Sequence, residues 1–206
     1  MKSTSHHWNN IFSGSVDSKL GWYEKDAAET LKLLYLIPNW QGSSVFISGA
    51  GTSVLIYQLL EKNNSLVLND ISAEALNEVK RQLKNTQHEI TWLCQDISLP
   101  IQNPIPKVDI WIDRAVLHFL TDENDIKGYF ENVNSTLDIG SHAIFAEFSK
   151  SGEDKCAGLN LHRYSVDELS ESLTPSFKLI TSFDHIYINP KGEERPYIYT
   201  LYKRIK

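Results

Sequence analysis

Short apolar runs alternate along the chain with stretches in which apolar residues recur at helical spacing. Leu76, Val79 and Leu83 share one helical face after the candidate N-cap residue Ser72, and Ser165 opens a capping-box sequence. The apolar runs are rich in Val, Ile and aromatic residues, as buried strands are; they cover residues 44–48, 65–68, 89–93, 108–112 and 142–148. Strands that alternate with crossover helices build a mostly parallel sheet that is covered on both faces.

The end of the chain breaks this alternation. Two long strand-like runs, Phe177 to Ile188 and Tyr197 to Arg204, are joined only by the turn-rich sequence NPKGEERP. This connection predicts a hairpin, because a crossover between parallel strands needs a longer link. One of the last two strands is therefore expected to run antiparallel to the rest of the sheet.

Length and composition favour a single domain over residues 1–206. Of the 206 residues, 41% are hydrophobic, and no internal repeat or domain boundary is visible. Two cysteines, Cys94 and Cys156, supply neither a disulfide framework nor a four-ligand zinc site, so we expect no metal centre and a reducing compartment. No run approaches the roughly 20 apolar residues of a membrane helix, so we expect no membrane association and a cytoplasmic location.

A glycine turn follows the first predicted strand. In VFISGAGTSVLIYQLL (residues 45–60), the strand runs into Gly49-Ala50-Gly51 and then into an amphipathic helix. Glycines at such a turn let a ligand lie against the main chain beside the amides of the helix N-terminus. The alternative is a plain tight turn between strand and helix.

Two aspartates lie at the ends of the next two strands. Asp70 follows the glycines by about 20 residues, where a carboxylate can hold both hydroxyls of a ribose. Asp96 lies where a carboxylate can accept from an adenine amino group. Each aspartate alone is also consistent with a turn or a helix cap, but three successive strand ends together indicate a cofactor that contains adenosine.

A nicotinamide dinucleotide and S-adenosylmethionine both bind to this architecture. The dinucleotide fingerprint places Gly or Ala where the helix packs on the strand, but this chain has Val54 there. The C-terminal hairpin also differs from a dinucleotide-binding fold. Both features favour S-adenosylmethionine.

Further blocks carry a family resemblance: HHWNNIFSGSVDSKLGWYEKD, LNDIS, CQDIS, VDIWIDRAVLHFLTD, AEFSKSGEDKCAGLNLHRYS and RPYIYTLYKR. Through these blocks and the glycine turn, the chain resembles the class I S-adenosylmethionine-dependent methyltransferases from His6 to Arg204. It is similar to a bacterial group of stand-alone methyltransferases in which an Asp-Arg-Ala-Val segment with a histidine follows the fourth strand. More distantly it resembles the eukaryotic lysine methyltransferases that share its N-terminal Trp and Trp-Tyr pattern.

The resemblance implies a Rossmann-like α/β fold. Its seven-stranded mixed sheet is mostly parallel, with the last strand antiparallel and helices on both faces. The resemblance also implies S-adenosylmethionine as the methyl donor and S-adenosylhomocysteine as the product, with Gly49 and Gly51 at the methionine part, Asp70 at the ribose and Asp96 at the adenine. The candidate cofactor-binding residues are Trp22, Gly49, Gly51, Thr52, Ser53, Asp70, Ile71, Asp96, Ile97 and Asp113.

The chain departs from the family pattern at two positions near the glycines. An acidic residue usually lies two positions before the first glycine, and a third glycine often follows; here the residues are Ile47 and Ser53. Without the acid, the ammonium group of the cofactor loses a partner. We expect Asp113 or a water molecule held by Ser48 to compensate.

The loops after the fourth and fifth strands are expected to face the acceptor, because ligands bind there in open sheets. Methyl transfer from a sulfonium is an in-line displacement, and a nearby base helps where the acceptor carries a proton. The candidate catalytic residues are Asp113 and His118; the alternatives are a structural Asp113–Arg114 ion pair and plain packing of His118. The candidate substrate-binding residues are Arg114, His118, Glu147 and Arg163.

Residues 1–26 are expected to form an N-terminal lid over the cofactor. Trp8, Trp22 and Tyr23 would exclude water there, and the alternative for them is surface packing. Cys156 lies in the loop expected to line the acceptor pocket, but its neighbours do not match those of a nucleophilic cysteine.

These features predict a methyltransferase that acts on a small molecule. The formal net charge of -6 and the lack of an Asn/Asp-Pro-Pro-aromatic segment after the fourth strand both disfavour nucleic acid as a partner. One alternative is a protein-lysine methyltransferase, which would take a protein substrate. Another is a non-catalytic cofactor-binding module, motivated by Ile47 and Ser53; a dehydrogenase ranks last.

Overall fold

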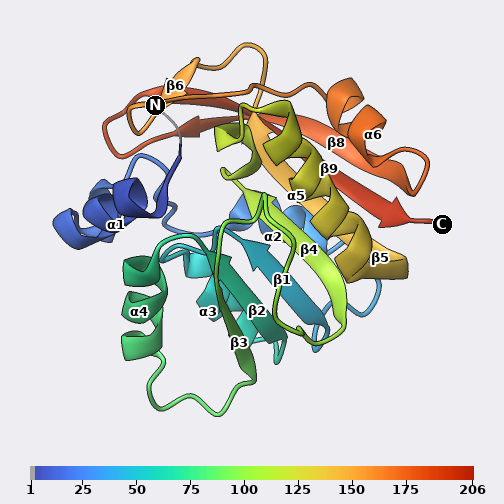
Figure 1. The fold of residues 1–206 in the computed structure, drawn as a ribbon, viewed down its shortest axis with the longest axis horizontal. Helices are drawn as coiled ribbons and strands as arrows, with labels where there is room; N and C mark the ends of the chain where they lie inside the picture. Colours follow the sequence, from blue (N-terminus) through green and yellow to red (C-terminus); the bar gives the residue numbers. More distant parts are fainter. Residues whose placement is uncertain (1–2) are drawn as a thin grey trace.

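In this computed structural model, which describes residues 3–206, a seven-stranded sheet forms the centre of the molecule (Figure 1). Its strands are β1 (Ser44–Ser48), β2 (Ser65–Asp70), β3 (Ile90–Cys94), β4 (Val108–Arg114), β5 (Leu137–Phe148), β8 (Phe177–Ile188) and β9 (Glu194–Arg204). Their order in the sheet is β3-β2-β1-β4-β5-β9-β8. Neighbouring strands from β3 to β5 are parallel, whereas β9 is antiparallel to both β5 and β8. The predicted mixed sheet with an antiparallel last strand is confirmed.

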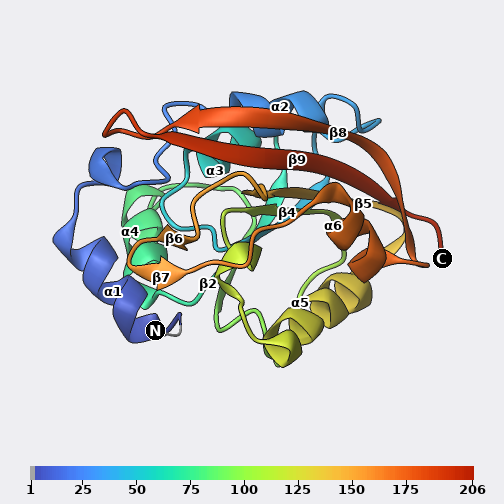
Figure 2. The ribbon, with the colours of Figure 1, turned by 90° about the horizontal axis from the view of Figure 1, so that it is seen from above.

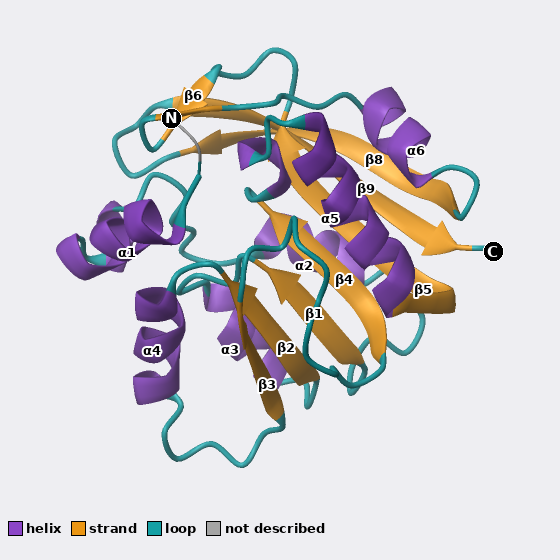
Figure 3. Cartoon of the chain, viewed as in Figure 1, coloured by secondary structure: helices purple, strands orange, loops and turns teal. Residues whose placement is uncertain are grey.

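Helices cover both faces of the sheet, as predicted (Figures 2 and 3). One face packs against α2 (Ala28–Leu34), α3 (Val54–Leu60) and α4 (Ala73–Gln82), and the other against α5 (Glu123–Thr136) and α6 (Val166–Leu173). α1 (Ser5–Gly14) lies beside α4 (Figure 1). The short elements are the 3-10 turns η1 (Asp17–Lys19) and η2 (Leu117–Phe119) and a small hairpin of β6 (Lys155–Cys156) and β7 (Leu159–Asn160).

The central strands bury side chains on both faces. Val45 and Ile47 of β1 belong to the core beneath α2 and α3. Phe46 between them belongs to the core beneath α5, where its ring stacks on Trp111 at a centroid distance of 4.0 Å. Successive side chains of a strand point to opposite faces, so a strand covered on both faces needs apolar residues at every position. This is why the strand appears in the sequence as an uninterrupted apolar run.

Two predicted helix starts are confirmed by hydrogen bonds. The Ser72 hydroxyl accepts from the backbone N–H of Ala75 at 3.2 Å. The Ser165 hydroxyl accepts from the backbone N–H of Glu168 at 3.2 Å, and the Glu168 carboxylate accepts from the backbone N–H of Ser165 at 2.9 Å. These reciprocal bonds are the capping box that the sequence predicts.

α1 and the β6–β7 hairpin have no counterpart in the sequence-based prediction. In α1, Trp8, Ile11 and Phe12 have the i, i+3, i+4 spacing of an amphipathic helix, so the signal was present in the sequence. The hairpin pairs two strands of two residues each, which are too short to show a period. Backbone pairing thus orders part of the loop that was predicted after the fifth strand.

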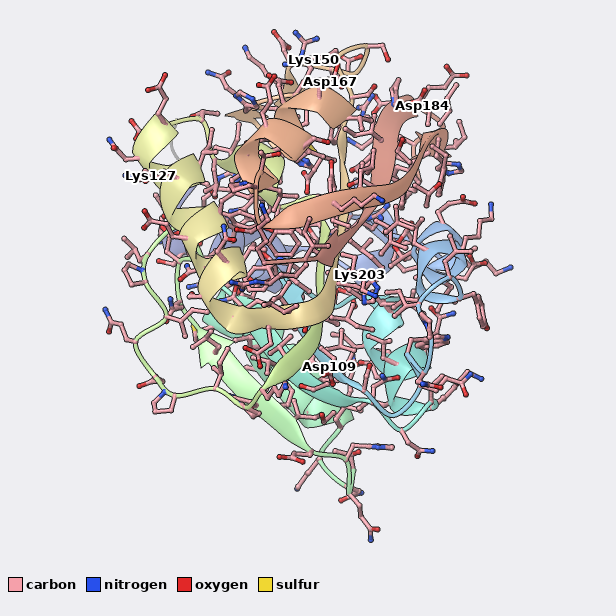
Figure 4. All side chains as sticks on the ribbon, turned by 90° about the vertical axis from the view of Figure 1, so that its right-hand side faces the viewer. Asp109, Lys127, Lys150, Asp167, Asp184 and Lys203 are labelled. Carbon is pink, nitrogen blue, oxygen red and sulfur yellow. The ribbon has the colours of Figure 1, made fainter. Side chains whose placement is uncertain are left out.

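Charged side chains lie on the outer surface of the sheet and helices (Figure 4). Lys127 on α5, Lys150 after β5, Asp167 on α6, Asp184 on β8 and Lys203 on β9 are all exposed. Within residues 3–206, none of the helices combines the length and the apolar character needed to cross a bilayer.

α5 packs closely on the loop that follows β3. The side-chain amide of Asn132 donates to the carbonyl oxygens of Ile97 at 2.7 Å and Leu99 at 2.8 Å. At Gly128, one turn earlier in the helix, a Cβ atom would lie 2.1 Å from the carbonyl oxygen of Ser98. Only a glycine permits this approach, which fixes the loop after β3 against the helix.

We expect Gly128→Ala to lower the free energy of unfolding by about 1–3 kcal/mol, because a clash with a backbone atom outweighs the better helix propensity of alanine. Urea denaturation followed by circular dichroism measures the change. Gly14→Ala is the matched control, since a Cβ there meets no atom within 4 Å. Equal stability of Gly128→Ala and the unaltered protein would contradict the close contact.

Candidate functional site

A pocket lies at the carboxyl ends of the parallel strands. The loops after β1, β2, β3 and β4 line it, together with the N-terminal segment and single residues of β6 and β9. The structure brings together most of the residues that the sequence predicted for the site: Trp22, Gly49, Gly51, Thr52, Ser53, Asp70, Ile71, Asp96, Ile97, Arg114 and His118. Asp113, Glu147 and Arg163 do not line the pocket.

The glycine turn after β1 is shaped by two left-handed residues. Gly49 has a φ of 56° and Gly51 a φ of 50°, a region that side chains disfavour. A Cβ on Gly49 would also lie 2.1 Å from Cγ2 of Val116, in the loop after β4. The turn therefore needs glycine for its backbone and for the close approach of the neighbouring loop.

Asp70 ties the end of β2 to this turn. One oxygen of its carboxylate accepts from the backbone N–H of Gly51 at 2.8 Å and the other from the backbone N–H of Ser72 at 2.7 Å. Burial raises the pKa of Asp70 to about 6, against hydrogen bonds from the backbone N–H groups of Ser72, Gly51 and Ile71, which lower it. A carboxylate has about four acceptor positions, so the backbone donors leave acceptor capacity for a ligand hydroxyl such as that of a ribose.

Asp96 is held in a similar way at the end of β3. Its Oδ1 accepts from the backbone N–H of Ser98 at 2.9 Å and from the Ser98 hydroxyl at 2.7 Å. Ile71, Ile97 and Leu120 line the same part of the pocket and offer apolar surface to a flat base. This combination fits an adenine, with a carboxylate for its amino group.

Two serines lie at or next to the positions where the chain departs from the family pattern. The Ser53 hydroxyl accepts from the backbone N–H of Leu55 at 3.2 Å and so caps α3. Ser48 lines the pocket, and its buried hydroxyl has no hydrogen-bond partner among residues 3–206. An unpartnered buried hydroxyl beside a glycine turn fits the polar end of S-adenosylmethionine, because buried polar groups are normally paired.

His118 lies in a fully buried cluster with Glu147. Its Nδ1 is 2.7 Å from Oε2 of Glu147, and the same oxygen accepts from the backbone N–H of His118 at 3.1 Å. Oε2 is thus an acceptor, which favours a proton on Nδ1 and leaves Nε2 free to accept. Nε2 has no partner within the described chain, and His118 lines the pocket. Burial lowers the pKa of His118 to about 3, so the ring is neutral near pH 7.

Asp113 and Glu147 lie behind the pocket wall, which corrects the prediction that they contact cofactor or substrate. Asp113 accepts from the hydroxyl of Tyr129 at 2.6 Å and from the backbone N–H of Val116 at 3.0 Å, and it is fully buried on the α5 face of the sheet. Burial raises the pKa of Glu147 to about 8. Burial and the neighbouring Glu147 also raise the pKa of Asp113 well above its usual range. Glu147 contacts His118, and Asp113 accepts from the backbone of the loop just before it.

Arg114 points to the opposite face from Asp113, so the ion pair considered as an alternative role for these two residues is not formed. Its Nε lies 3.0 Å from Oε1 of Glu24, and its Nη1 donates to the carbonyl oxygen of Trp22 at 3.0 Å. The guanidinium also lies over the rings of Tyr187 and Tyr197, 5.1 and 5.4 Å from their centroids. Arg114 therefore connects the sheet to the N-terminal segment.

Aromatic contacts hold the N-terminal segment at the carboxyl ends of the strands (Figure 1). The ring of Trp8 packs edge-on against Trp22 at 5.4 Å and against Phe119 at 4.9 Å. On the other side of α1, the side-chain oxygen of Asn9 accepts from the Ser72 hydroxyl at 2.8 Å. Trp8, Phe12 and Trp22 of this segment line the pocket.

Arg163 lies outside the pocket, which corrects its prediction as a substrate-binding residue. Its Nη1 donates to the carbonyl oxygens of Lys150 at 3.2 Å and Gly152 at 2.9 Å, so it fixes the loop after β5. Glu24 and Tyr197 line the pocket without having been named for a site, and Cys156, whose loop was expected at the acceptor pocket, lines it as well. Glu24 lies in a block of family resemblance, but nothing in its own spacing marked it.

Comparisons with known proteins agree with this geometry. Residues 45–140 match a family model described as a methyltransferase domain. A SAM-dependent methyltransferase from Anabaena variabilis has a TM-score of 0.77 and 14% identity, with 97% of this chain and 93% of that chain covered. The 1,6-didemethyltoxoflavin-N1-methyltransferase of Burkholderia thailandensis, bound to 1,6-didemethyltoxoflavin and S-adenosylhomocysteine, has a TM-score of 0.69 and 14% identity, with 98% and 84% covered.

The N-methyltransferase NodS of Bradyrhizobium japonicum, in complex with S-adenosylhomocysteine, has a TM-score of 0.66 and 16% identity, with 87% of each chain covered. A search of curated proteins finds no match. At such identities the solved structures show a shared fold. The chain thus shares the fold of these S-adenosylmethionine-dependent methyltransferases, and its matched methyltransferase domain and its pocket agree with the resemblance to the class I enzymes that the sequence indicates.

Proposed function

We propose that this protein transfers a methyl group from S-adenosylmethionine to a small-molecule acceptor by in-line displacement and releases S-adenosylhomocysteine. The observation that carries the proposal is a single pocket that joins the glycine turn, Asp70 and Asp96 to the unpartnered ring nitrogen of His118. When bound, the cofactor supplies a methyl group on a sulfonium. The protein's tasks are then to position the acceptor and to exclude water.

The glycine turn and the two aspartates are proposed to hold the cofactor. The main chain at Gly49 and Gly51 takes the methionine part, Asp70 the ribose hydroxyls and Asp96 the adenine. Hydrogen bonds from neighbouring backbone groups already fix both carboxylates, so little side-chain freedom remains to be lost on binding. The remaining proposed contacts are Trp22, Thr52, Ser53, Ile71 and Ile97, which line the same pocket.

A small acceptor fits the space beside His118. Trp8, Phe119, Cys156 and Tyr197 line the pocket there, so its walls are mainly aromatic and apolar. We propose that residues 3–26 act as a lid, and a pocket covered in this way favours a small molecule over a folded protein. Two similar structures support this choice, since one is an N-methyltransferase by name and the other holds 1,6-didemethyltoxoflavin.

His118 is proposed to accept a proton from the acceptor during transfer. His118 lines the pocket, its buried Nε2 has no hydrogen-bond partner among the described residues, and its Nδ1 lies 2.7 Å from Oε2 of Glu147. The imidazole is neutral near pH 7, so its Nε2 is able to accept a proton.

Calorimetry with S-adenosylmethionine and S-adenosylhomocysteine tests the proposal, followed by a screen of thiol, amine and carboxylate acceptors monitored by homocysteine release. We expect both cofactor forms to bind and at least one small acceptor to be methylated. Absence of binding to both forms would overturn the enzymatic reading. Methylation of protein lysines without any small acceptor would replace the proposal with a protein-lysine methyltransferase.

We expect His118→Asn to lower kcat by roughly 10²–10⁴-fold, the range typical of a general base. Asparagine can still donate to Glu147 from the position of Nδ1, but it offers no atom at the position of Nε2. The dissociation constant for S-adenosylhomocysteine should stay within about twofold, because His118 is not proposed to hold the cofactor. Steady-state kinetics and calorimetry provide the two readouts, and an unchanged kcat would remove the base assignment.

We expect Glu147→Gln to change how stability depends on pH. The unfolded chain ionises Glu147 near its ordinary value of 4.5, whereas burial raises the pKa in the folded protein to about 8. Between these values the folded state binds more protons, so this carboxyl lowers the free energy of unfolding as pH rises. Glutamine removes that loss.

Relative to the unaltered protein, the free energy of unfolding of the Glu147→Gln variant should therefore rise from pH 5 to pH 8 by on the order of 2 kcal/mol. Urea denaturation at both pH values measures it. Glu131→Gln, on the exposed face of α5, is the control and should show a constant difference. A pH-independent difference for Glu147→Gln would contradict a buried, protonated carboxyl.

A further inference from the structure

We propose that Glu24 supplies the carboxylate that β1 lacks at position 47, and that Glu24 and Arg114 together bind the amino-acid end of the cofactor. Glu24 would take the α-ammonium group and Arg114 the α-carboxylate. The inference rests on the proposed function and adds two charged residues to the cofactor site, one of them from the N-terminal segment.

Strand register places the pair close to Ile47. In the pairing of β1 with β4, Ile47 lies opposite Ile112, and both belong to the core beneath α2 and α3. Side chains two residues apart on a strand share a face, so Arg114 is on the same face as Ile47, one pair further toward the pocket. Its partner Glu24, 3.0 Å away, therefore brings a carboxylate to the region where the family pattern expects one.

The two charges are nearly buried and border the pocket. The side chain of Glu24 is 12% exposed and that of Arg114 is 11% exposed, and both residues line the pocket together with Ile47 and Ser48. A buried ion pair contributes little net stability, because desolvation opposes the attraction between the charges. Side by side at the wall of a pocket, the same two charges match the opposite charges of an amino acid.

Arg114 has a donor left over for a ligand. Nε forms an ion pair with Glu24, and Nη1 donates to the carbonyl oxygen of Trp22. Nη2 is buried and makes neither an ion pair nor a hydrogen bond of normal geometry among the described residues, although Tyr199 lies close to the guanidinium. A guanidinium presents its donors in a fork that suits a carboxylate. Nη2 is thus the atom that the α-carboxylate would satisfy.

The negative charge of Glu24 is only partly balanced by Arg114. Burial raises its pKa to about 7, with Asp26 and Glu29 adding to the rise and Arg114 opposing it. A second positive group beside this carboxylate would offset the cost of burying its charge. The ammonium group of the cofactor is such a group.

Calorimetry with two ligands tests the proposal. S-adenosylhomocysteine carries the amino-acid end, whereas 5′-methylthioadenosine has the same nucleoside and thioether without it. We expect Glu24→Gln to weaken the binding of S-adenosylhomocysteine by roughly 10–100-fold, the effect of losing one charge-assisted hydrogen bond. The binding of 5′-methylthioadenosine should weaken by less than about twofold. Glu24→Asp keeps the charge, so its affinity for S-adenosylhomocysteine should lie between those of the unaltered protein and the Glu24→Gln variant. Glu29→Gln removes a nearby carboxylate that does not line the pocket and should change neither affinity.

An equal loss of affinity for both ligands would overturn the proposal, because Glu24 would then only anchor the N-terminal segment. Unchanged affinities for both ligands would overturn it as well. Thermal melts of the variants separate either result from unfolding. For Arg114, the unaltered protein should bind decarboxylated S-adenosylhomocysteine at least about tenfold more weakly than the intact ligand, and equal affinities would remove its role. Failure of the unaltered protein to bind S-adenosylhomocysteine would instead refute the proposed function.

Discussion

The pleat of β4 divides the charges of the site between the two faces of the sheet. Asp113 and Arg114 are consecutive, so their side chains must point in opposite directions. Asp113 bonds to Tyr129 beneath α5, and Arg114 pairs with Glu24 of the N-terminal segment. Backbone pairing with β1 on one side and β5 on the other fixes this register. A slip of one residue would exchange the two faces and dismantle both halves of the site.

The buried polar groups of the site differ in how fully they are hydrogen-bonded, and those without a partner belong to residues that line the pocket. Asp113 accepts from a tyrosine hydroxyl and from backbone amides, as a buried carboxyl requires. Three other buried polar atoms have neither a hydrogen bond nor an ion pair within residues 3–206, although their residues line the pocket: Ser48 Oγ, Arg114 Nη2 and His118 Nε2. Native proteins rarely leave such atoms unpaired. A polar ligand in this pocket would satisfy them at little cost in rearrangement.

The parts of this structure that follow local rules could be predicted from the sequence. Apolar runs predict the strands, and the glycine turn with Asp70 and Asp96 predicts three adjoining strand ends, because parallel strands bring their carboxyl ends together. The departure at Ser53 has a local reason as well, since its hydroxyl caps α3. The strand pattern also predicts that Asp113 and Arg114 diverge, but it does not say which face meets the pocket.

The parts that depend on distant contacts could not be predicted. Glu24 reaches Arg114 across most of the N-terminal half of the chain, and no spacing encodes that meeting. Glu147 and Arg163 were expected at the acceptor because they follow the fifth strand. Glu147 instead turns inward to His118, and Arg163 binds the carbonyl oxygens of its own loop. A position along a strand or loop does not specify which neighbour a long side chain finds.

The edge strand β8 has a bearing on how the covering segment moves. The hydroxyl of Tyr187 in β8 donates to the carbonyl oxygen of Tyr23, and its ring lies against the guanidinium of Arg114. The outer edge of the sheet therefore contacts the same short stretch of chain that we propose as a lid. In such a lid, admitting or releasing a ligand would break the contacts of this stretch with both β4 and β8, so the C-terminal hairpin would set part of the barrier to ligand exchange.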